Sequence, residues 1–156
     1  MGIERVRQYF KQFGIEDKIL EFPVSSATVE LAAKALGCDE AHIAKTLAFM
    51  VNGKAVLVVC AGDAKINNSK FKQVFNTKAK MLKPGELIDL VGHSVGGVCP
   101  FGVNEGVLVY LDKSLKRFTH VYPACGSSNS AIKLTLPELE KYSNYISYVD
   151  VTTIPE

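Results

Sequence analysis

Ile43-Ala44-Lys45-Thr46-Leu47-Ala48-Phe49 is a run of strand-forming residues with one lysine at its centre. Side chains alternate between the two faces of a β-strand, so Lys45 shares a face with three apolar neighbours. Burying an unpaired ammonium among apolar groups is costly. The sequence therefore leaves two interpretations of Lys45: an edge position whose aliphatic stem carries the charge to water, or a position that faces a bound ligand.

The residues after this strand predict its partner. Asn52-Gly53 is a strong signal for a two-residue hairpin. A strand at residues 54–61 should therefore pair antiparallel with residues 43–51. Further strands are expected at residues 19–22, 79–82, 107–111, 131–134 and 145–151.

Apolar residues at helical spacing alternate with these strands. The first expected helix covers residues 3–13, and the second covers residues 29–36 with Ser25 or Ser26 as its N-terminal cap. Shorter helices are expected after Asn68 or Ser69, over residues 84–91, after Asp112 and over residues 136–142. This order contains an antiparallel hairpin and no strict strand-helix-strand repeat. It predicts an α+β fold in which flanking helices cover a mixed, partly barrel-like β-sheet of about seven strands.

The composition fits a single domain that spans residues 1–156. The chain is 47% hydrophobic and 22% charged, and it has no low-complexity tract. No apolar run approaches the length of a membrane span, and residues 1–7 lack the apolar core of a signal peptide. The four cysteines are scattered without a CxxC pair, which favours reduced thiols over a disulfide framework or a zinc site. We therefore expect a cytoplasmic protein with no membrane contact, no metal and no cofactor.

The charge is unevenly distributed along the chain. The net charge of +2 does not by itself indicate a nucleic-acid-binding protein. Between residues 65 and 83, however, six lysines occur without any acidic residue among them. This basic segment is either a solvated surface or a surface that neutralises phosphates.

Residues 92–102 form a second unusual stretch, with four glycines and one proline. This composition predicts a loop whose backbone N–H groups are free to face a ligand, with an ordinary connector as the alternative. His93 and Cys99 could pair as a base and a thiol nucleophile, but no acidic residue is placed to orient His93. The lysine strand, this loop and the polar loop at residues 123–130 together suit a phosphorylated or carbonyl ligand.

Five segments resemble, in the same order, the YbaK/prolyl-tRNA synthetase-associated family, whose members are freestanding relatives of the editing domain in bacterial prolyl-tRNA synthetases. They are Ser25-Ser26-Ala27-Thr28-Val29-Glu30, Ile43-Ala44-Lys45-Thr46-Leu47, Ala61-Gly62-Asp63, Gly96-Gly97-Val98-Cys99-Pro100-Phe101-Gly102 and Asp112-Lys113-Ser114-Leu115. The resemblance covers nearly the whole chain and implies the same kind of fold. It also implies a trans-acting aminoacyl-tRNA deacylase, with mischarged tRNA as its substrate and an aminoacyl-tRNA synthetase as a partner.

The resemblance also implies roles for single residues. Lys45 matches a functional lysine that helps to bind and orient the terminal nucleotide and the ester. Gly96 and Pro100 match a GxxxP loop whose backbone amides would hold the ester carbonyl or the attacking water. These three are the expected catalytic residues. The expected substrate-binding residues are Thr28, Thr46, Gly97, Gly126 and Ser127, and the expected tRNA-binding residues are Lys70, Lys72, Lys78 and Lys80. No protein nucleophile is required if a ribose hydroxyl of the substrate helps to activate the water.

The late polar loop departs from the family pattern. Many members carry two glycines where this chain has Cys125-Gly126, and cysteine-removing members carry polar residues where it has Ala124 and Ala131. A pocket with Thr28 and Thr46 suits a small amino acid such as alanine, serine or threonine instead. Two alternatives stay open: a non-catalytic module that binds aminoacyl-tRNA or a nucleotide in the same pocket, and a thiol-dependent hydrolase that uses Cys99.

Overall fold

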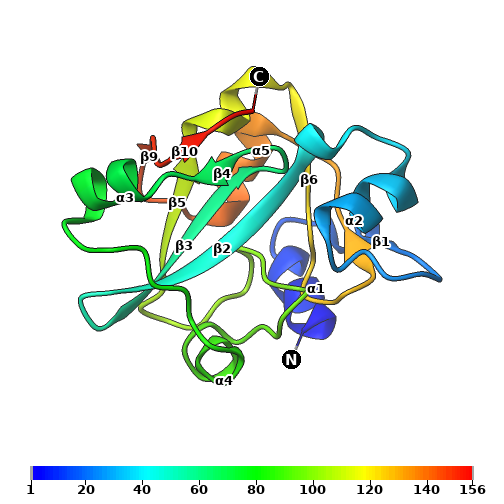
Figure 1. Cartoon of the computed structure of the whole chain (residues 1–156). Helices are drawn as coiled ribbons and strands as arrows, with labels where there is room; N and C mark the ends of the chain where they lie inside the picture. The colour runs from blue at the N-terminus through cyan, green and yellow to red at the C-terminus, as the bar shows by residue number, and fades with distance from the viewer. Residues whose placement is uncertain (1, 156) are drawn as a thin grey trace.

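The computed structural model describes residues 2–155 and is built around a mixed six-stranded sheet (Figure 1). Its strands are β2 (Ile43–Val51), β3 (Lys54–Ala61), β5 (Leu108–Asp112), β6 (His120–Pro123), β8 (Leu134–Thr135) and β9 (Tyr148–Val149), in the spatial order β8-β6-β2-β3-β5-β9. Two antiparallel ribbons join β1 (Leu20–Glu21) to β7 (Ser130–Ala131) and β4 (Lys65–Ile66) to β10 (Thr152–Thr153). The predicted α+β class and the mixed, partly barrel-like sheet are confirmed.

The hairpin of β2 and β3 forms as the sequence predicts. The two strands pair antiparallel from Ala44 opposite Ala61 to Val51 opposite Lys54. Asn52 and Gly53 both adopt positive φ angles, 50° and 79°, as a two-residue turn of this kind requires. All of β3 beyond Lys54 is buried, because packed side chains cover both of its faces.

Helices cover the sheet and close its ends (Figure 1). They are α1 (Ile3–Lys11), α2 (Val29–Leu36), α3 (Asn68–Phe75), α4 (Pro84–Glu86) and α5 (Leu136–Ser143), joined by the short helical turns η1 (Glu16–Lys18), η2 (Glu40–His42), η3 (Leu87–Val91) and η4 (Lys113–Arg117). α3 lays Phe71 and Phe75 against Phe49 and Val56 on one face of the hairpin. The larger core lies on the other face and includes Phe10 of α1. Within residues 2–155, no helix combines the length and the apolar character needed to cross a bilayer.

The N-terminal caps of two helices differ from the expected residues. Thr28 caps α2, because its hydroxyl accepts a hydrogen bond from the Leu31 amide at 3.1 Å. Ser25 and Ser26 instead turn their hydroxyls to the Ser128 carbonyl, which lies across the chain in the late polar loop.

The cap of α3 is Asn67 rather than Asn68 or Ser69. Its side chain accepts a hydrogen bond from the Lys70 amide at 2.9 Å. The Asn67 amide itself donates to the Val151 carbonyl at 2.8 Å, which holds the backbone extended up to this residue. The helix therefore begins at the next position.

Several expected strands are shorter than predicted or absent. Residues 79–82 form only one isolated bridge, between Met81 and Phe49. Residues 131–134 divide into parts of two short strands, and residues 145–151 contain only the two-residue strand β9. The expected helix over residues 84–91 begins as α4 and continues as the π-helical η3. In each segment the contacts with distant strands, rather than the local pattern, determine where regular structure stops.

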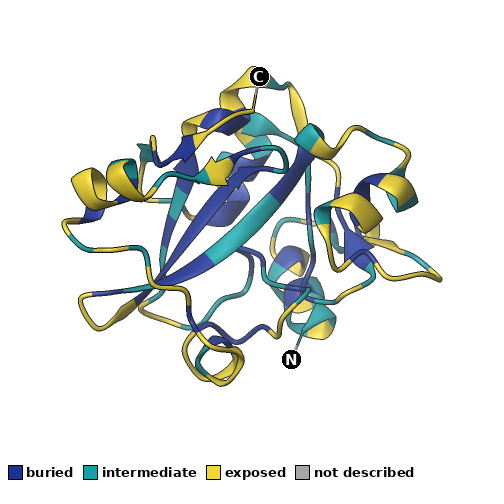
Figure 2. Ribbon diagram, in the orientation of Figure 1, coloured by how far each residue is buried: buried dark blue, intermediate teal, exposed yellow. Residues whose placement is uncertain are grey.

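One edge of β2 has a gap in its hydrogen-bonding partners. β6 pairs with the start of β2, at Ile43 and Ala44. Further along, the Ala48 carbonyl accepts from the Leu82 amide at 3.0 Å and the Met50 amide donates to the Lys80 carbonyl at 2.9 Å. Between these two contacts the middle of β2 is only half-buried, whereas β3 beside it is buried (Figure 2). The gap is the opening of a cavity.

Candidate functional site

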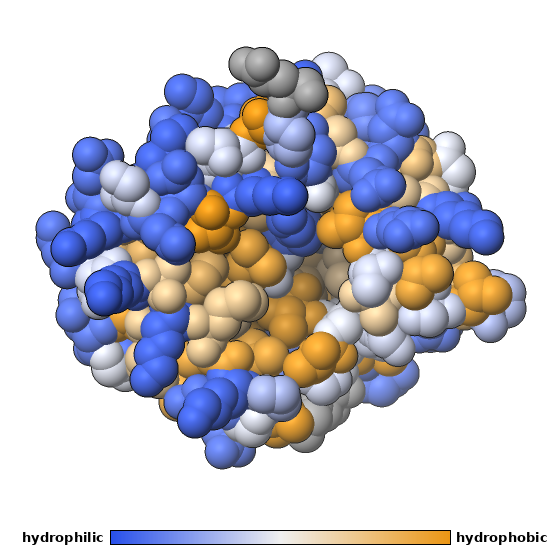
Figure 3. All heavy atoms as spheres, in the orientation of Figure 1, coloured by the Kyte–Doolittle hydropathy of each residue, from blue (hydrophilic) through white to orange (hydrophobic). Residues whose placement is uncertain are grey.

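A cavity of about 370 Å³ lies along the open edge of β2. Its walls come from α2 and the residues before it, β2, the segment that leads into α4, the glycine-rich loop, and β6 with the polar loop after it. Figure 3 shows a hollow in the middle of this face, lined largely by apolar residues. The volume falls within the range of about 300–1,000 Å³ that is usual for small-molecule sites.

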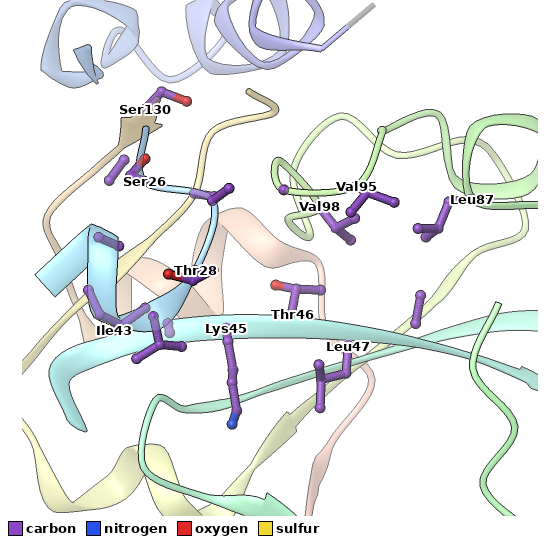
Figure 4. A pocket seen from close by; sticks show the side chains of 18 of the residues that line it. Ser26, Thr28, Ile43, Lys45, Thr46, Leu47, Leu87, Val95, Val98 and Ser130 are labelled. Carbon is purple, nitrogen blue, oxygen red and sulfur yellow. The ribbon is translucent and has the colours of Figure 1, made fainter. Parts of the chain in front are cut away.

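Lys45 and Thr46 both belong to the wall formed by β2, but their side chains leave opposite sides of the strand (Figure 4). The Thr46 side chain lies on the same side of β2 as Thr28 and Val98. Its hydroxyl is buried and has no hydrogen-bond partner within the described residues. The wall of the cavity therefore contains a buried hydroxyl whose hydrogen-bonding capacity no described residue uses.

The Lys45 ammonium is held by the turn that follows β3. It donates to the Ala64 carbonyl at 2.5 Å and lies 3.4 Å from the Gly62 carbonyl. Its charge contributes to the lowered pKa of the nearby Asp63 carboxyl, whose main cause is the hydrogen bond from Arg117. The structure thus gives Lys45 protein partners on the far side of β2 from the Thr46 hydroxyl, and the ligand-facing role inferred for its ammonium stays a prediction.

The segment before α2 closes one end of the cavity. Ser26 and Thr28 both line it, with their side chains placed as in Figure 4. Ser26 is buried and fixed by the Ser128 carbonyl, to which both its amide, at 2.6 Å, and its hydroxyl, at 3.3 Å, donate. The hydroxyl of Thr28 accepts from the Leu31 amide, so it retains a proton to donate.

The glycine-rich loop forms the wall opposite β2, with Val95, Gly96 and Val98 in contact with the cavity. Gly96 has a φ of 90°, a conformation that other residues adopt only with strain. A side chain on Gly97 would lie 2.5 Å from the Gly126 carbonyl carbon, so the two loops pack backbone to backbone. Pro100 is buried outside the lining of the cavity, so it shapes the loop rather than reaching a ligand.

The amides of this loop are not equally free. The Gly97 amide donates to the Ser94 carbonyl at 3.1 Å, which closes a turn. Within residues 2–155 no hydrogen bond uses the amides of Gly96 or Val98, and both residues line the cavity. Two residues of the cavity wall therefore have unpaired amides, and the prediction that these amides face a ligand stays open.

The late polar loop supports the cavity from behind. Gly126 and Ser127 are not part of the lining. Ser127 donates a hydrogen bond to the hydroxyl of Ser130 at 2.7 Å, and Ser130, which is buried, lines the cavity. Gly126 and Ser127 thus help to place Gly97 and Ser130, and their expected contact with a ligand stays a prediction.

Cys99 and His93 are close but unsuited to nucleophilic catalysis. The sulfur lies 3.6 Å from His93 Nε2, and both side chains are fully buried away from the cavity. Nε2 also lies 2.8 Å from the Phe101 carbonyl, which can only accept, so Nε2 carries the proton and cannot remove one from the thiol. Burial raises the pKa of the Cys99 thiol to about 12. This geometry argues against the thiol-dependent hydrolase.

The expected tRNA-binding lysines divide into two kinds. Lys70 is engaged with the Asp150 carboxylate at 3.1 Å and the Thr152 carbonyl at 2.8 Å. Lys72, Lys78 and Lys80 are exposed and form no ion pair within the part of the chain that the structure describes. Met81, next in the chain to Lys80, lines the cavity, so the basic segment adjoins the site.

Sequence reasoning missed most of the apolar wall. Met81, Leu82 and Leu87 line the cavity from a segment that was expected to be an ordinary strand and helix. Met81 and Val95 are 56% and 63% exposed, which is unusual for large apolar side chains on two neighbouring walls. The only sequence signal was the presence of apolar residues in turns and loops.

The titratable side chains of the lining are Lys45 and Tyr122, and within residues 2–155 the lining has no carboxylate, imidazole or thiol. The usual general bases are therefore lacking in the lining formed by the described residues, and the Lys45 ammonium already donates to backbone carbonyls. Water or the substrate itself is the remaining source of a base for a hydrolysis there.

Comparisons with known proteins agree on the kind of domain. The family model described as an aminoacyl-tRNA editing domain matches residues 24–142. The chain is 50% identical over 152 residues to the uncharacterized protein YwhH of Bacillus subtilis, with 97% of each chain covered. It is 29% identical over 129 residues to a proline–tRNA ligase of Solidesulfovibrio magneticus, which covers 81% of this chain but only 22% of the ligase. A crystal structure described as a candidate trans-editing enzyme for prolyl tRNA synthetase superposes with a TM-score of 0.87 and 27% identity, covering 97% of this chain and 96% of the other.

Proposed function

Because this chain belongs to the aminoacyl-tRNA editing domain family, we propose that it is a trans-acting deacylase. Its substrate is a tRNA that carries a wrongly attached small amino acid, and its reaction is hydrolysis of the ester that joins the two. The observation that carries the proposal is the cavity at the open edge of β2, which joins unpaired backbone amides to an apolar wall. Similarity over the full length to a candidate trans-editing enzyme supports action on a separately bound tRNA.

In the proposed reaction the protein positions the ester and stabilises charge. Water attacks the ester carbonyl, a new carbon–oxygen bond forms, and the bond to the ribose oxygen breaks. The products are the free amino acid and the tRNA, whose ribose oxygen takes a proton from the water. The neighbouring ribose hydroxyl of the substrate serves as the relay for this proton, because the lining has no acid-base side chain suited to the task. The amides of Gly96 and Val98 are donors for the developing oxyanion.

The proposed preference for a small amino acid rests on the side chains around Thr46. Thr28, Ser26 and Ser130 offer short hydroxyl side chains on that side of β2, and Ala124 and Ala131 complete the lining near them. The unpartnered Thr46 hydroxyl favours serine or threonine over alanine, because their hydroxyls would satisfy it. Differences of one methylene or hydroxyl are worth about 1–3 kcal/mol in such pockets, so the preference is graded.

The proposal also assigns a partner and a place of action. The similarity to prolyl-tRNA synthetases favours proline tRNA as the first tRNA to test, and a synthetase that releases mischarged tRNA as the partner. Such a protein works where tRNA is charged, in the cytoplasm. Lys45 is proposed to leave its carbonyl partners and bind the ester or phosphate end of the tRNA.

The test is a deacylation screen with the full chain. Proline tRNA and its counterparts are charged separately with alanine, serine, threonine, cysteine and proline, and release of each amino acid is compared with its spontaneous hydrolysis. The proposal predicts accelerated release for one or more of the small non-cognate residues and none for proline. A protein that binds an aminoacyl-adenosine analogue but turns over no substrate of the panel would be the non-catalytic module instead.

A further inference from the structure

The gap in the edge of β2 lies between Ala44 and the carbonyl of Ala48. β6 ends its pairing at Ala44, and the segment of Lys80 to Leu82 begins its contacts at Ala48. In an antiparallel strand every second residue turns both its N–H and its C=O to the same edge. Because Ala48 and Met50 turn theirs away from β3, Thr46 must do so as well. Thr46 thus presents an unpaired donor and acceptor at this edge, and the Ala48 N–H beside it also has no partner in the described residues.

The polar groups of Thr46 have no protein partners in the gap. No hydrogen bond within residues 2–155 uses its backbone N–H or C=O, and its hydroxyl is buried without a partner. Buried backbone groups are almost always paired. Thr46 lines the cavity, so a ligand at the open edge of β2 can pair with its backbone N–H and C=O.

We infer that the open edge of β2 captures the aminoacyl unit of the substrate as a one-residue antiparallel strand, and that this contact requires a free α-amino group. The inference rests on the proposed function and specifies which part of the substrate the site recognises, namely the aminoacyl unit with its free α-amino group. Two residues that face each other in a hydrogen-bonded antiparallel pair exchange both N–H···O bonds. The α-ammonium of the substrate donates to the Thr46 carbonyl, and the Thr46 amide donates to the ester carbonyl.

This pairing fixes the direction of the substrate. An antiparallel aminoacyl unit points its ester toward the Lys45 end of β2 and its amino group toward the Leu82 end. The Thr46 amide then reaches the oxygen on which negative charge develops, so it adds a donor to those of Gly96 and Val98. When two residues lie directly opposite each other in an antiparallel pair, their side chains point to the same face of the sheet. The substrate's side chain would therefore lie beside that of Thr46.

The gap also limits what can be bound. A peptidyl or N-acylated residue would have to continue the strand past its amino group, where the Leu82 amide already occupies the edge through Ala48. Acylation also removes the positive charge and replaces the ammonium by an amide. We therefore expect the site to accept aminoacyl esters and to reject peptidyl and N-acylated esters.

A binding experiment tests the inference without relying on catalysis. The probes are two hydrolysis-resistant analogues of the substrate end, 3′-serylamido-3′-deoxyadenosine and its N-acetylated form, titrated into ¹⁵N-labelled full-length protein. The unblocked analogue should shift the amide resonance of Thr46 and bind at least about tenfold more tightly than the acetylated one, as expected for a charge-assisted hydrogen bond of about 1.5–3 kcal/mol. Equal affinities, or a Thr46 amide that does not respond, would overturn the inference.

A kinetic arm separates this inference from the proposed function. Proline tRNA charged with serine, or with whichever small amino acid the screen finds to be released, and its N-acetylated form are offered at equal concentration, and kcat/KM should fall by about 10- to 100-fold on acetylation. Equal hydrolysis of both would reject the edge capture and leave the deacylase intact. Analogue discrimination without any turnover would support the edge capture and reject the deacylase. Thr46→Val keeps the backbone, so it should preserve the discrimination even if its overall rate falls; losing the discrimination in this variant would instead assign the contact to the hydroxyl.

Discussion

The side chains of Lys45 and Thr46 lie on opposite sides of β2 and have different partners. The Thr46 side chain lies on the side of Thr28 and Val98, and the Lys45 ammonium bonds the carbonyls of the turn after β3 (Figure 4). These carbonyl partners satisfy the charge without help from a substrate. The lysine in this apolar strand is therefore compatible with a stable fold, and its binding of a phosphate or an ester stays a proposal.

Replacing Lys45 separates its structural role from its proposed catalytic role. Lys45→Met keeps the aliphatic stem and removes the ammonium, so deacylation should fall by about 10²-fold or more, in the range for loss of one donor to developing charge. The free energy of unfolding should fall by no more than about 3 kcal/mol, the upper range for a hydrogen bond to a charged group. Deacylation kinetics and urea unfolding are measured on the same preparation. Full activity in the folded variant would remove Lys45 from the catalytic set.

His93 makes the stability of the glycine-rich loop depend on pH. Burial lowers the pKa of His93 from its ordinary value of 6.5, and it outweighs the bond to the Phe101 carbonyl. Its Nδ1 is buried without a partner in the described residues, so a proton there would have nothing to bond. The unfolded chain therefore binds this proton more readily than the folded one.

The expected result is a loss of stability in mild acid. The contribution of neutral His93 is complete above pH 6.5 and is lost as the pH falls toward the lowered pKa of the folded state. The unfolding free energy in urea should drop by at most about 1.4 kcal/mol per pH unit in this window. His93→Gln cannot titrate, so its stability should change less between pH 7.5 and 5.5. Parallel curves for the two proteins would assign the pH dependence to other groups.

At the scale of elements, the cavity depends on the contact between two loops. Gly97 of the glycine-rich loop meets the backbone of Gly126 and Ser127 so closely that a Cβ would stand 2.5 Å and 2.6 Å from their atoms. Gly126 in turn packs against Val6 of α1, 2.9 Å from where its own Cβ would lie. Backbone contact therefore fixes Gly97, and through it helps to set the position of the neighbouring Gly96 in the cavity wall.

This contact predicts a strong effect of one methyl group. Gly97→Ala should destabilise the fold by about 1–3 kcal/mol, as overpacking does, and should lower deacylation further by moving Gly96. Gly85→Ala in α4 is the matched control, because no atom lies within 4 Å of the position that its added methyl group would take and the change favours helix. Urea unfolding and deacylation rates are compared for both. Similar stabilities of the two variants would mean that the loops can separate without cost.

The elements that local sequence signals could predict are those whose conformation depends on residues close together in the chain. The Asn52-Gly53 turn, the strands on both sides of it and the glycine-rich loop were predicted because each depends on residues that are neighbours in the chain. The gap at Thr46 could not be predicted, because it depends on where β6 and the Lys80–Leu82 segment stop pairing. The same holds for Ser130, which reaches the cavity only through contacts between distant loops. Local patterns thus predicted several of the segments around the cavity, whereas their arrangement depends on contacts that exist only in the assembled sheet.

At the scale of the whole molecule, the basic segment of residues 65–83 leads into one wall of the cavity. Lys72, Lys78 and Lys80 are exposed, and the chain passes directly from Lys80 into the cavity wall at Met81. Lys70 differs, because its ammonium donates hydrogen bonds to the Asp150 carboxylate and the Thr152 carbonyl. A tRNA whose terminal residue enters the cavity therefore has a basic surface next to it for the preceding phosphates.

Reversing this charge should weaken tRNA recognition without altering the chemistry. In Lys72→Glu/Lys78→Glu/Lys80→Glu, KM for aminoacyl-tRNA should rise by about tenfold or more, and log KM should depend less steeply on log salt, by roughly 0.7 for each lost contact with single-stranded phosphate. Cleavage of an aminoacyl-adenosine ester should be unchanged, because this minimal substrate has no preceding phosphates. The control is Lys11→Glu/Lys18→Glu/Lys133→Glu, which changes the net charge equally at exposed lysines outside the basic segment. If both triple variants raise KM to the same extent, the effect comes from net charge, and the basic segment is not the tRNA surface.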